Sequence, residues 1–252
     1  MLKAVILAGN ETKREATADS KAVGQLQDKA TCIIGGKMMI EYVVDALIKS
    51  ACVDHIAVIG DKTKLQFLES MVHLEVIQST DNLADNVILG IKRYEGKKVL
   101  ISTSDIPMIT EEAIRDFVSK GQSMEADLCY SIISKKRMQE KYPENQRTYV
   151  KLKDGQFTGG NLFLVDSLKV NSYLDIGKKM LLYRKKPWRM VKLLGMPFLV
   201  KLILGRLSIM DVEKRVASMM GIRGKAVTCD YPEVGNDVDR PEDLALAIKY
   251  MT

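Results

Sequence analysis

Short apolar runs alternate with amphipathic patterns along the first half of the chain. The apolar runs have the length of strands and occupy residues 3–8, 55–60, 74–78 and 97–103. Runs without polar alternation are typical of strands that are buried on both faces of a sheet. Between them, apolar residues recur at helical spacing, as at Ile40, Val43, Val44 and Leu47. This alternation predicts an α/β fold, a Rossmann-like three-layer α/β/α sandwich around a mostly parallel, mixed sheet.

Polar and special residues mark the ends of the predicted helices. We expect Thr80 or Asp81 to cap one helix and Thr110 to cap the next, because their side-chain oxygens can accept from backbone N–H groups. Gly121 is expected to end the second of these helices. Pro241 falls in the first turn of the last predicted helix, where its missing N–H costs no hydrogen bond.

The second half of the chain follows a different pattern. Strand-like stretches joined by polar turns occur at residues 126–133, 148–154 and 156–165, and they indicate antiparallel pairing. Residues 171–222 read as a basic, apolar helical insert, and residues 225–230 as a final strand. Because no linker or repeat divides the chain, we expect a single domain over residues 1–252.

The net charge of +6 is concentrated in one segment. Residues 178–206 hold nine Lys or Arg and no Asp or Glu, so the rest of the chain is slightly acidic. A local basic segment argues against a nucleic-acid partner that is bound along a whole face. Three interpretations of the segment stay open: a helical flap with its cations in water, a surface for an anionic membrane or a lipid-like acceptor, and a homodimer interface.

The cysteines and the apolar stretches suggest a location. Cys32, Cys52, Cys129 and Cys229 are scattered along the chain, which is typical of reduced thiols in a cytosolic protein. The apolar run at residues 5–8 is too short for a secretion signal. Residues 193–204 reach only about half of the roughly 20 apolar residues of a membrane span. We therefore expect a cytoplasmic protein, with peripheral membrane contact through residues 178–206 as an open alternative.

Candidate chemistry gathers where predicted parallel strands end. Gly9, Gly60 and Asp105 each lie at the carboxyl end of such a strand, the edge at which α/β sheets bind ligands. Neither the G-x-G-x-x-G pattern of dinucleotide sites nor the G-x-x-x-x-G-K-[ST] pattern of P-loops follows the first strand. The phosphate chemistry of those two protein classes is therefore not favoured.

Five stretches occur in an order that is informative as a set. They are VILAG (5–9), DK with IGGKMMIEYVVDAL (28–47), SDIPMIT (104–110), TGGNLFLV (158–165) and GNDVDRPEDL (235–244). In this order the sequence resembles the MobA-like NTP transferases, which are nucleotidyltransferases of the GT-A-like nucleotide-diphospho-sugar transferase superfamily. The resemblance implies a GT-A-like fold and the transfer of NMP from an NTP to a phosphorylated acceptor, with release of pyrophosphate.

The nucleotide side of the expected site lies near the first strand. We expect backbone contacts to the nucleotide from Leu7, Ala8 and Gly9, where a side chain beyond glycine would block close approach. Lys29 matches the family lysine that contacts phosphates, and we assign it a catalytic role. Asn82 or Asn86 is expected to meet the base or the ribose, with helix capping as the alternative. For our assignment we choose Asn86.

Carboxylates supply the expected metal site. Asp105 follows a buried strand, where a carboxylate can hold Mg²⁺ against phosphate oxygens and serve catalysis; capping of the next turn is the alternative. Asp237 and Asp239 alternate in an extended stretch, so their side chains can point the same way. The resemblance implies a second metal contact here. Asp239 lies close before Pro241 and could instead cap the last helix.

The acceptor side is expected on a different strand. Gly159 and Gly160 interrupt a strand pattern, which often marks close approach of a ligand or a bulge. The resemblance places the acceptor at these glycines and at Asn161. The sequence leaves open the identity of the NTP and the choice between a small phosphorylated acceptor and a lipid headgroup.

Departures from the family pattern keep other functions open. Asn10 stands where the family commonly has a second glycine, and Lys13 or Arg14 would have to supply the loop cation. This altered loop prompts a non-catalytic nucleotide-binding protein as one alternative. A GT-A-type glycosyltransferase that uses an NDP-sugar is another, although it usually has an Asp-x-Asp motif where this chain has only Asp105.

Overall fold

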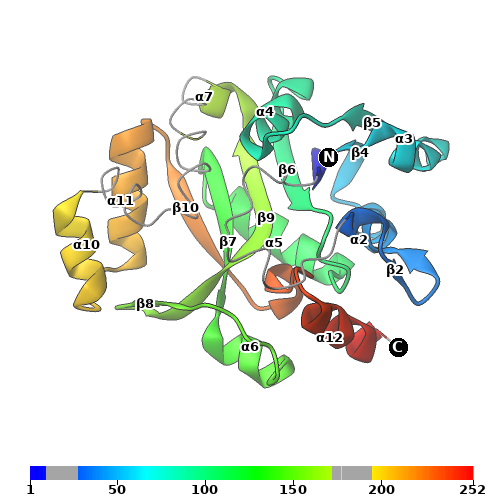
Figure 1. Cartoon of the computed structure of the whole chain (residues 1–252). Helices are drawn as coiled ribbons and strands as arrows, with labels where there is room; N and C mark the ends of the chain where they lie inside the picture. The colour runs from blue at the N-terminus through cyan, green and yellow to red at the C-terminus, as the bar shows by residue number, and fades with distance from the viewer. Residues whose placement is uncertain (10–27, 172–176, 178–194, 252) are drawn as a thin grey trace.

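The computed structural model describes residues 1–9, 28–171, 177 and 195–251 (Figure 1). Its centre is an eight-stranded sheet in the order β10-β7-β9-β6-β1-β4-β5, and β8 pairs with β9 beside this path. The strands are β1 (Leu2–Ala8), β4 (Val53–Gly60), β5 (Leu74–Gln78), β6 (Lys98–Thr103), β7 (Leu128–Ser134), β8 (Val150–Leu152), β9 (Gly155–Asp166) and β10 (Gly224–Cys229).

Strand direction confirms a mixed sheet that is mostly parallel. β1 runs parallel to both of its neighbours, β4 and β6, and β4 runs parallel to β5. In the other half β7 and β10 are parallel to each other. β9 lies between β6 and β7 and is antiparallel to both. The antiparallel pairing expected for residues 126–133, 148–154 and 156–165 is thus confirmed, because β9 is antiparallel to both β7 and β8.

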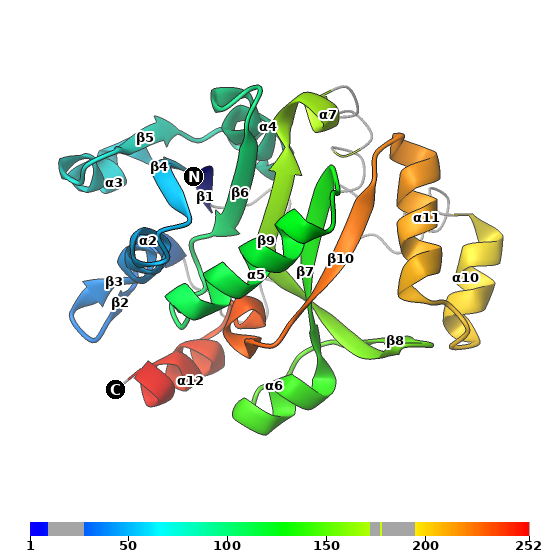
Figure 2. The ribbon, with the colours of Figure 1, turned by 180° about the vertical axis from the view of Figure 1, so that it is seen from behind.

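Helices cover both faces of the sheet and make two apolar cores. Successive side chains of β1 point to opposite faces, so Ile6 joins one core and Val5 joins the other, both fully buried. The first core packs under α2 (Met39–Lys49) and α5 (Glu111–Ser123), and α5 crosses in front of the sheet in Figure 2. The second packs under α4 (Leu83–Arg93) and α11 (Ile209–Met220). This is the expected three-layer α/β/α sandwich.

Short elements complete the described chain. They are η1 (Lys29–Thr31), β2 (Ile33–Ile34), β3 (Lys37–Met38), α3 (Lys62–Leu65), η2 (Gln66–Ser70), α6 (Lys135–Lys141), α7 (Ser167–Asn171), α10 (Met196–Ile203), η3 (Pro232–Gly235) and α12 (Pro241–Met251). The last of these begins at Pro241, as expected. The predicted strand at 148–154 is shorter than expected, since β8 spans only Val150–Leu152.

Helix ends confirm one predicted cap and correct another. Thr110 caps α5, and its side chain accepts from the N–H of Ala113. α4 is capped by Asn82 rather than by Thr80 or Asp81. The Asn82 Oδ1 atom accepts from the next helical N–H groups, at 2.8 Å from that of Ala84.

The predicted end of α5 at Gly121 is wrong, because the helix continues to Ser123. Gly121 is a buried helical residue that faces β9 and β7. A Cβ atom there would lie 3.2 Å from Cδ2 of Leu164 and 3.6 Å from Cβ of Cys129. The glycine therefore allows the helix to approach the sheet closely rather than ending it.

Part of the basic insert is helical. Two helices, α10 and α11, lie within residues 171–222, whereas residues 172–176 and 178–194 fall outside the described residues, as does the loop with Lys13 and Arg14. Among the described helices, none has both the length and the apolarity that crossing a membrane requires. All four cysteines are free thiols.

Candidate functional site

The parallel register of β1, β4 and β6 brings three strand ends to one edge of the sheet. Ala8 pairs with Gly60 and Leu7 with Thr103, and the N–H of Ser104 donates to the carbonyl of Leu7 at 3.1 Å. Gly9 and Asp105 follow directly, at the same edge. The sheet therefore places the predicted nucleotide turn beside the predicted metal ligand.

A distant part of the chain returns to this edge and brings two more carboxylates. The N–H of Val238 donates to the carbonyl oxygen of Asp105 at 2.8 Å, and the Val238 side chain is buried in the first core. Its neighbours Asp237 and Asp239 are thereby held beside Asp105. One carboxylate oxygen from each of the three aspartates lies within 4.8 Å of the others. The predicted acidic cluster is therefore assembled in the structure.

Lys29 supplies positive charge to this cluster. It begins η1, whose next residue, Ala30, is buried and anchors the turn. The Lys29 Nζ atom donates to Oδ2 of Asp105 at 2.9 Å and also to Oδ1 of Asp239. Burial acts to lower the pKa of Lys29, but Asp105 and Asp239 outweigh it and raise the pKa above its ordinary value. The ammonium is therefore fully charged at neutral pH.

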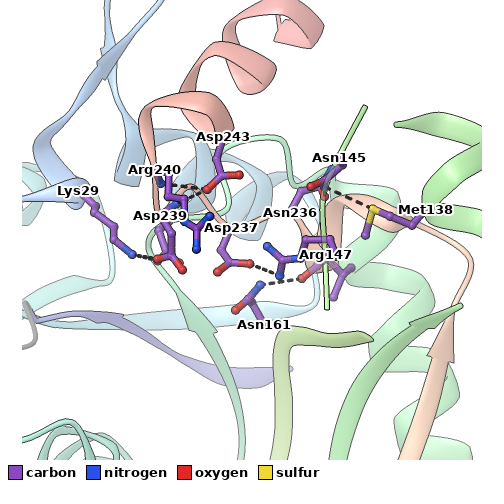
Figure 3. A network of polar contacts seen from close by, with 12 residues as sticks. Lys29, Met138, Asn145, Arg147, Asn161, Asn236, Asp237, Asp239, Arg240 and Asp243 are labelled. Atoms are coloured by element: carbon purple, nitrogen blue, oxygen red, sulfur yellow. Dashed lines mark hydrogen bonds and ion pairs between the residues drawn. The ribbon is translucent and has the colours of Figure 1, made fainter. Parts of the chain in front are cut away.

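Arg147, which the sequence analysis did not identify, pairs with the third carboxylate. Its guanidinium donates to Oδ1 of Asp237 from the segment between α6 and β8, as Figure 3 shows. Burial raises the pKa of Asp237, Arg147 lowers it, and Asp105 and Asp239 raise it further; the net direction is upward. No motif marks this arginine, and its partner is 90 positions away in the sequence.

A set of amides fixes the strand and turn beside Arg147. Asn161, on β9, donates through Nδ2 to the carbonyl of Val234 at 3.1 Å. Asn145 donates to the side-chain oxygen of Asn236, which is buried immediately before Asp237 (Figure 3). These bonds tie η3 to β9 and to the end of α6. Asn161 thus lies beside the acidic cluster, and part of its hydrogen-bonding capacity holds η3 in place.

The two glycines of β9 are explained by packing against β7. A Cβ atom on Gly159 would stand 1.9 Å from the hydroxyl oxygen of Tyr130. A Cβ atom on Gly160 would stand 2.4 Å from Oγ of Ser131 and 2.9 Å from Cγ1 of Val234. A side chain at either position would therefore displace its neighbours even without a ligand, and the role of both glycines toward an acceptor stays a prediction.

Asn86 lies behind the predicted nucleotide turn. Its side chain is buried and is bonded to Thr80, accepting from the Thr80 N–H at 2.7 Å and donating to the Thr80 carbonyl at 3.1 Å. A Cβ atom on Gly9 would lie 2.8 Å from Nδ2 of Asn86. Asn86 therefore supports the loop after β5, and direct contact with a nucleotide stays a prediction, as it does for Leu7, Ala8 and Gly9. Asn82 caps α4, which was the alternative to contact with the base or the ribose.

The acidic cluster has the donor set for a divalent cation that prefers oxygen ligands. Oδ1 of Asp105 is buried and has no hydrogen-bond partner among the described residues. An orphaned carboxylate oxygen is costly unless a cation or water completes it. Three carboxylates with one such oxygen fit Mg²⁺, whose ligands in phosphate sites are a few carboxylates, water and the substrate.

Comparison with known proteins identifies the family. The sequence profile of the MobA-like NTP transferase domain matches residues 4–195. The chain belongs to the MobA-like NTP transferase family. A solved structure described as a hypothetical transferase, from Thermus thermophilus, is 34% identical, with a TM-score of 0.80 over 96% of this chain and 99% of that one. A search of curated proteins found no match.

More distant structures share the fold of this MobA-like chain. A 4-diphosphocytidyl-2C-methyl-D-erythritol synthase from Anaerococcus prevotii is 11% identical, with a TM-score of 0.61 over 99% of this chain and 97% of that one. A nucleotidyl transferase from Methanothermobacter is 16% identical, with a TM-score of 0.55 over 99% of this chain and 97% of that one. Together with the family, this fold supports a nucleotidyltransferase. The family profile ends before Asp237 and Asp239, so these two ligand candidates depend on the geometry.

Proposed function

We propose that the protein is a Mg²⁺-dependent nucleotidyltransferase that transfers NMP from an NTP to a phosphorylated acceptor and releases pyrophosphate. The observation that carries this proposal is the convergence of three carboxylates and Lys29 beside the turn at Gly9. Membership of the MobA-like NTP transferase family supports the same reaction.

The residues of the chain would act mainly by position and charge. An acceptor oxygen attacks the α-phosphorus of the NTP, and the bond from that phosphorus to the oxygen of the leaving pyrophosphate breaks. The turn at Gly9 lets the backbone approach the nucleotide, and the Lys29 ammonium neutralises phosphoryl oxygens. Mg²⁺, held by Asp105, Asp237 and Asp239, would offset the negative charge that gathers on those oxygens.

The acceptor would approach from the side of Arg147. This guanidinium pairs with Asp237, whereas Lys29 pairs with Asp105 and Asp239, so the cluster has a cation on each side. A planar guanidinium suits a phosphate group because it can donate two parallel hydrogen bonds. Asn161, with Gly159 and Gly160 on the same strand, would line this side, and the NTP would occupy the side of Gly9 and Lys29.

Pyrophosphate release tests the proposal. The protein is incubated with each of the four NTPs, Mg²⁺ and a panel of sugar phosphates, polyol phosphates and phosphorylated lipid headgroups. We expect one NTP and one acceptor class to release pyrophosphate, and Asp105→Asn to lower the rate by about 10³-fold or more. The control is Asp45→Asn, which removes a partly exposed carboxylate of α2 that pairs with Lys37 of β3.

Three results would overturn the proposal. The Asp105→Asn variant could retain the wild-type rate, which would remove this carboxylate from the reaction. The wild-type protein could release NDP from an NDP-sugar instead of pyrophosphate from an NTP, which is the outcome for a glycosyltransferase. It could also bind an NTP tightly without turning it over across the whole panel, which is the outcome for a non-catalytic nucleotide-binding protein.

A further inference from the structure

Lys135 lies at the same edge of the sheet as the acidic cluster. β6 and β7 are both antiparallel to β9, so they run in the same direction and end at the same edge. Asp105 follows the end of β6, and Lys135 comes directly after β7. Lysine side chains are mostly exposed in proteins, whereas Lys135 is only partly exposed. The sheet therefore brings another lysine, besides Lys29, to the edge of the candidate site.

The register of three strands brings Lys135 to Tyr149. Ser134, the last residue of β7, and Val150, the first residue of β8, both pair with Phe157 of β9. Lys135 and Tyr149 are the chain neighbours of these paired residues. The Lys135 Nζ atom lies over the Tyr149 ring, 5.6 Å from its centre. Figures 1 and 2 both show β8 beside the junction of β7 and α6.

Tyr149 links this lysine to Arg147 and so to the acidic cluster. Burial raises the pKa of Tyr149 and the nearby Arg147 guanidinium lowers it, with a net direction upward. Arg147 itself pairs with Asp237. The polar groups therefore form a row that leads outward from the cluster, in the order Asp237, Arg147, Tyr149 and Lys135.

Two polar groups of this row lack a partner. Among the described residues, Lys135 has no carboxylate partner, whereas its neighbours Lys136 and Arg137 both pair with Glu140. The hydroxyl oxygen of Tyr149 is buried and has no hydrogen-bond partner in the described part of the chain. A buried polar group without a partner costs free energy, which a bound ligand or a water molecule would recover.

The charge of the row suits a phosphomonoester. Arg147 and Lys135 bring two positive charges, and Asp237 balances one of them. A phosphomonoester carries a charge of about −1.5 to −2 at pH 7 and has three acceptor oxygens. It can therefore accept from a guanidinium, an ammonium and a hydroxyl at the same time. A phosphodiester carries only a single negative charge, so these groups would bind it more weakly.

We propose that Lys135 and Tyr149 extend the acceptor side beyond Arg147 into a subsite for a phosphomonoester group of the acceptor. The Lys135 ammonium, on its flexible stem, moves from the ring to the phosphate oxygens, and the Tyr149 hydroxyl donates to one of them. The inference rests on the proposed function for the statement that this group belongs to the acceptor. The binding of phosphate itself can be measured without an NTP.

Calorimetric titration with inorganic phosphate, in a chelator and at constant ionic strength, tests the subsite. We expect Lys135→Met to weaken phosphate binding at least about tenfold, because a charge-assisted hydrogen bond is lost. The matched control is Lys136→Met. Lys136 is the next residue of α6, is exposed and pairs with Glu140, so this variant should bind phosphate as the wild type does. The phosphodiester dimethyl phosphate should bind the wild type more weakly than inorganic phosphate.

The Tyr149→Phe variant separates a ligand contact from a packing role. It keeps the ring and removes only the unpartnered hydroxyl, so the thermal midpoint should be unchanged or slightly higher. Phosphate binding should nevertheless weaken about threefold to tenfold. In the pyrophosphate assay, Lys135→Met and Tyr149→Phe should raise the KM for the acceptor and leave the KM for the NTP unchanged.

The outcomes distinguish the subsite from the reaction. The subsite is contradicted if the wild type does not bind phosphate, if Lys135→Met or Tyr149→Phe binds it as the wild type does, or if Lys136→Met weakens binding equally. Circular dichroism checks that each variant is folded. If phosphate binding depends on Lys135 and Tyr149 while no NTP releases pyrophosphate with any acceptor, the proposed function fails and the phosphate site stands.

Discussion

The ammonium group of Lys29 lies 2.9 Å from Oδ2 of Asp105, although the two residues are 76 positions apart in the chain. Lys29 also donates to Asp239, so one lysine bridges two of the three clustered carboxylates. Three carboxylates this close would repel one another if all were charged and alone. Lys29 supplies counter-charge to Asp105 and Asp239, and Arg147 supplies it to Asp237.

Removal of that counter-charge should make stability depend on a divalent cation. We expect Lys29→Met to lower the free energy of unfolding by about 2 kcal/mol in a chelator, because partly buried carboxylates lose their partner. Added Mg²⁺ should recover much of this loss, since the cation neutralises the same oxygens. Thermal unfolding with EDTA and with Mg²⁺ measures both effects.

The control for this prediction is Lys37→Met, which removes an exposed lysine from its pair with Asp45. An exposed pair contributes little, so this variant should unfold as wild type does in both conditions. If Lys29→Met were equally stable in EDTA and in Mg²⁺, the three carboxylates would not form a cation site.

Substitutions in β9 can separate packing from ligand approach. Gly159→Ala should destabilise the fold by about 1–3 kcal/mol, because its Cβ would overlap the Tyr130 hydroxyl. The double variant Tyr130→Phe with Gly159→Ala should recover part of this loss, since the overlapping oxygen is gone. Urea unfolding of the wild type, both single variants and the double variant completes the cycle.

The absence of a stability loss in Gly159→Ala would favour a role of this glycine in ligand binding. A Gly159→Ala variant as stable as the wild type, but with a raised KM for the acceptor, would mean that the glycine is required by the ligand and not by Tyr130. The packing explanation would also be contradicted if the effects of Gly159→Ala and Tyr130→Phe on the free energy of unfolding were simply additive in the double variant.

Stability should fall at alkaline pH through the thiol of Cys229. Burial, followed by the nearby Asp116, raises the pKa of this thiol from 9.0 to about 12. Above pH 9 the unfolded chain releases the thiol proton while the folded protein keeps it, so the unfolded state gains stability. The stability of the wild type relative to Cys229→Ala should therefore be constant below that pH and shrink by up to about 1.4 kcal/mol per pH unit above it.

Urea unfolding under reducing conditions, at a series of pH values for both proteins, measures this difference. Tyr94, whose pKa is raised to about 12, mainly by burial, titrates in the same range. It is present in both proteins, so its contribution cancels in the comparison. A constant difference up to about pH 11 would show that the folded protein does not hold the Cys229 proton.

Local sequence patterns predict those strands and strand-end residues that are determined by their immediate neighbours in the chain. The strand at 3–8 is a continuous apolar run because it is buried on both faces, and β1 is found there. Asp105 could be assigned to a ligand edge because it directly follows a buried strand. The alternation of Asp237 and Asp239 required only an extended backbone, and one hydrogen bond from Val238 then fixes both beside Asp105.

Long-range contacts were beyond the reach of such patterns. Arg147 gains its role only because the chain returns to place Asp237 against it, and nothing near Arg147 in the sequence announces this. The sequence pattern at Gly159 and Gly160 indicates either close approach of a ligand or a bulge. The pairing of β7 with β9 shifts its register between Tyr130 and Ile132, beside these glycines, and their side-chain neighbours are Tyr130 and Ser131 across the sheet. That explanation requires the register of β7 against β9, which the sequence alone does not specify.

The antiparallel strand β9 has a consequence for the order in which the nascent chain can become compact. β6 and β7 are separated by β9, which is synthesised after both of them. Until residues 155–166 have left the ribosome, the outer edge of β6 has no neighbouring strand and can pair with other chains. Shielding by a chaperone would therefore matter most during that interval, and a stalled chain that ends before β9 would be prone to aggregate.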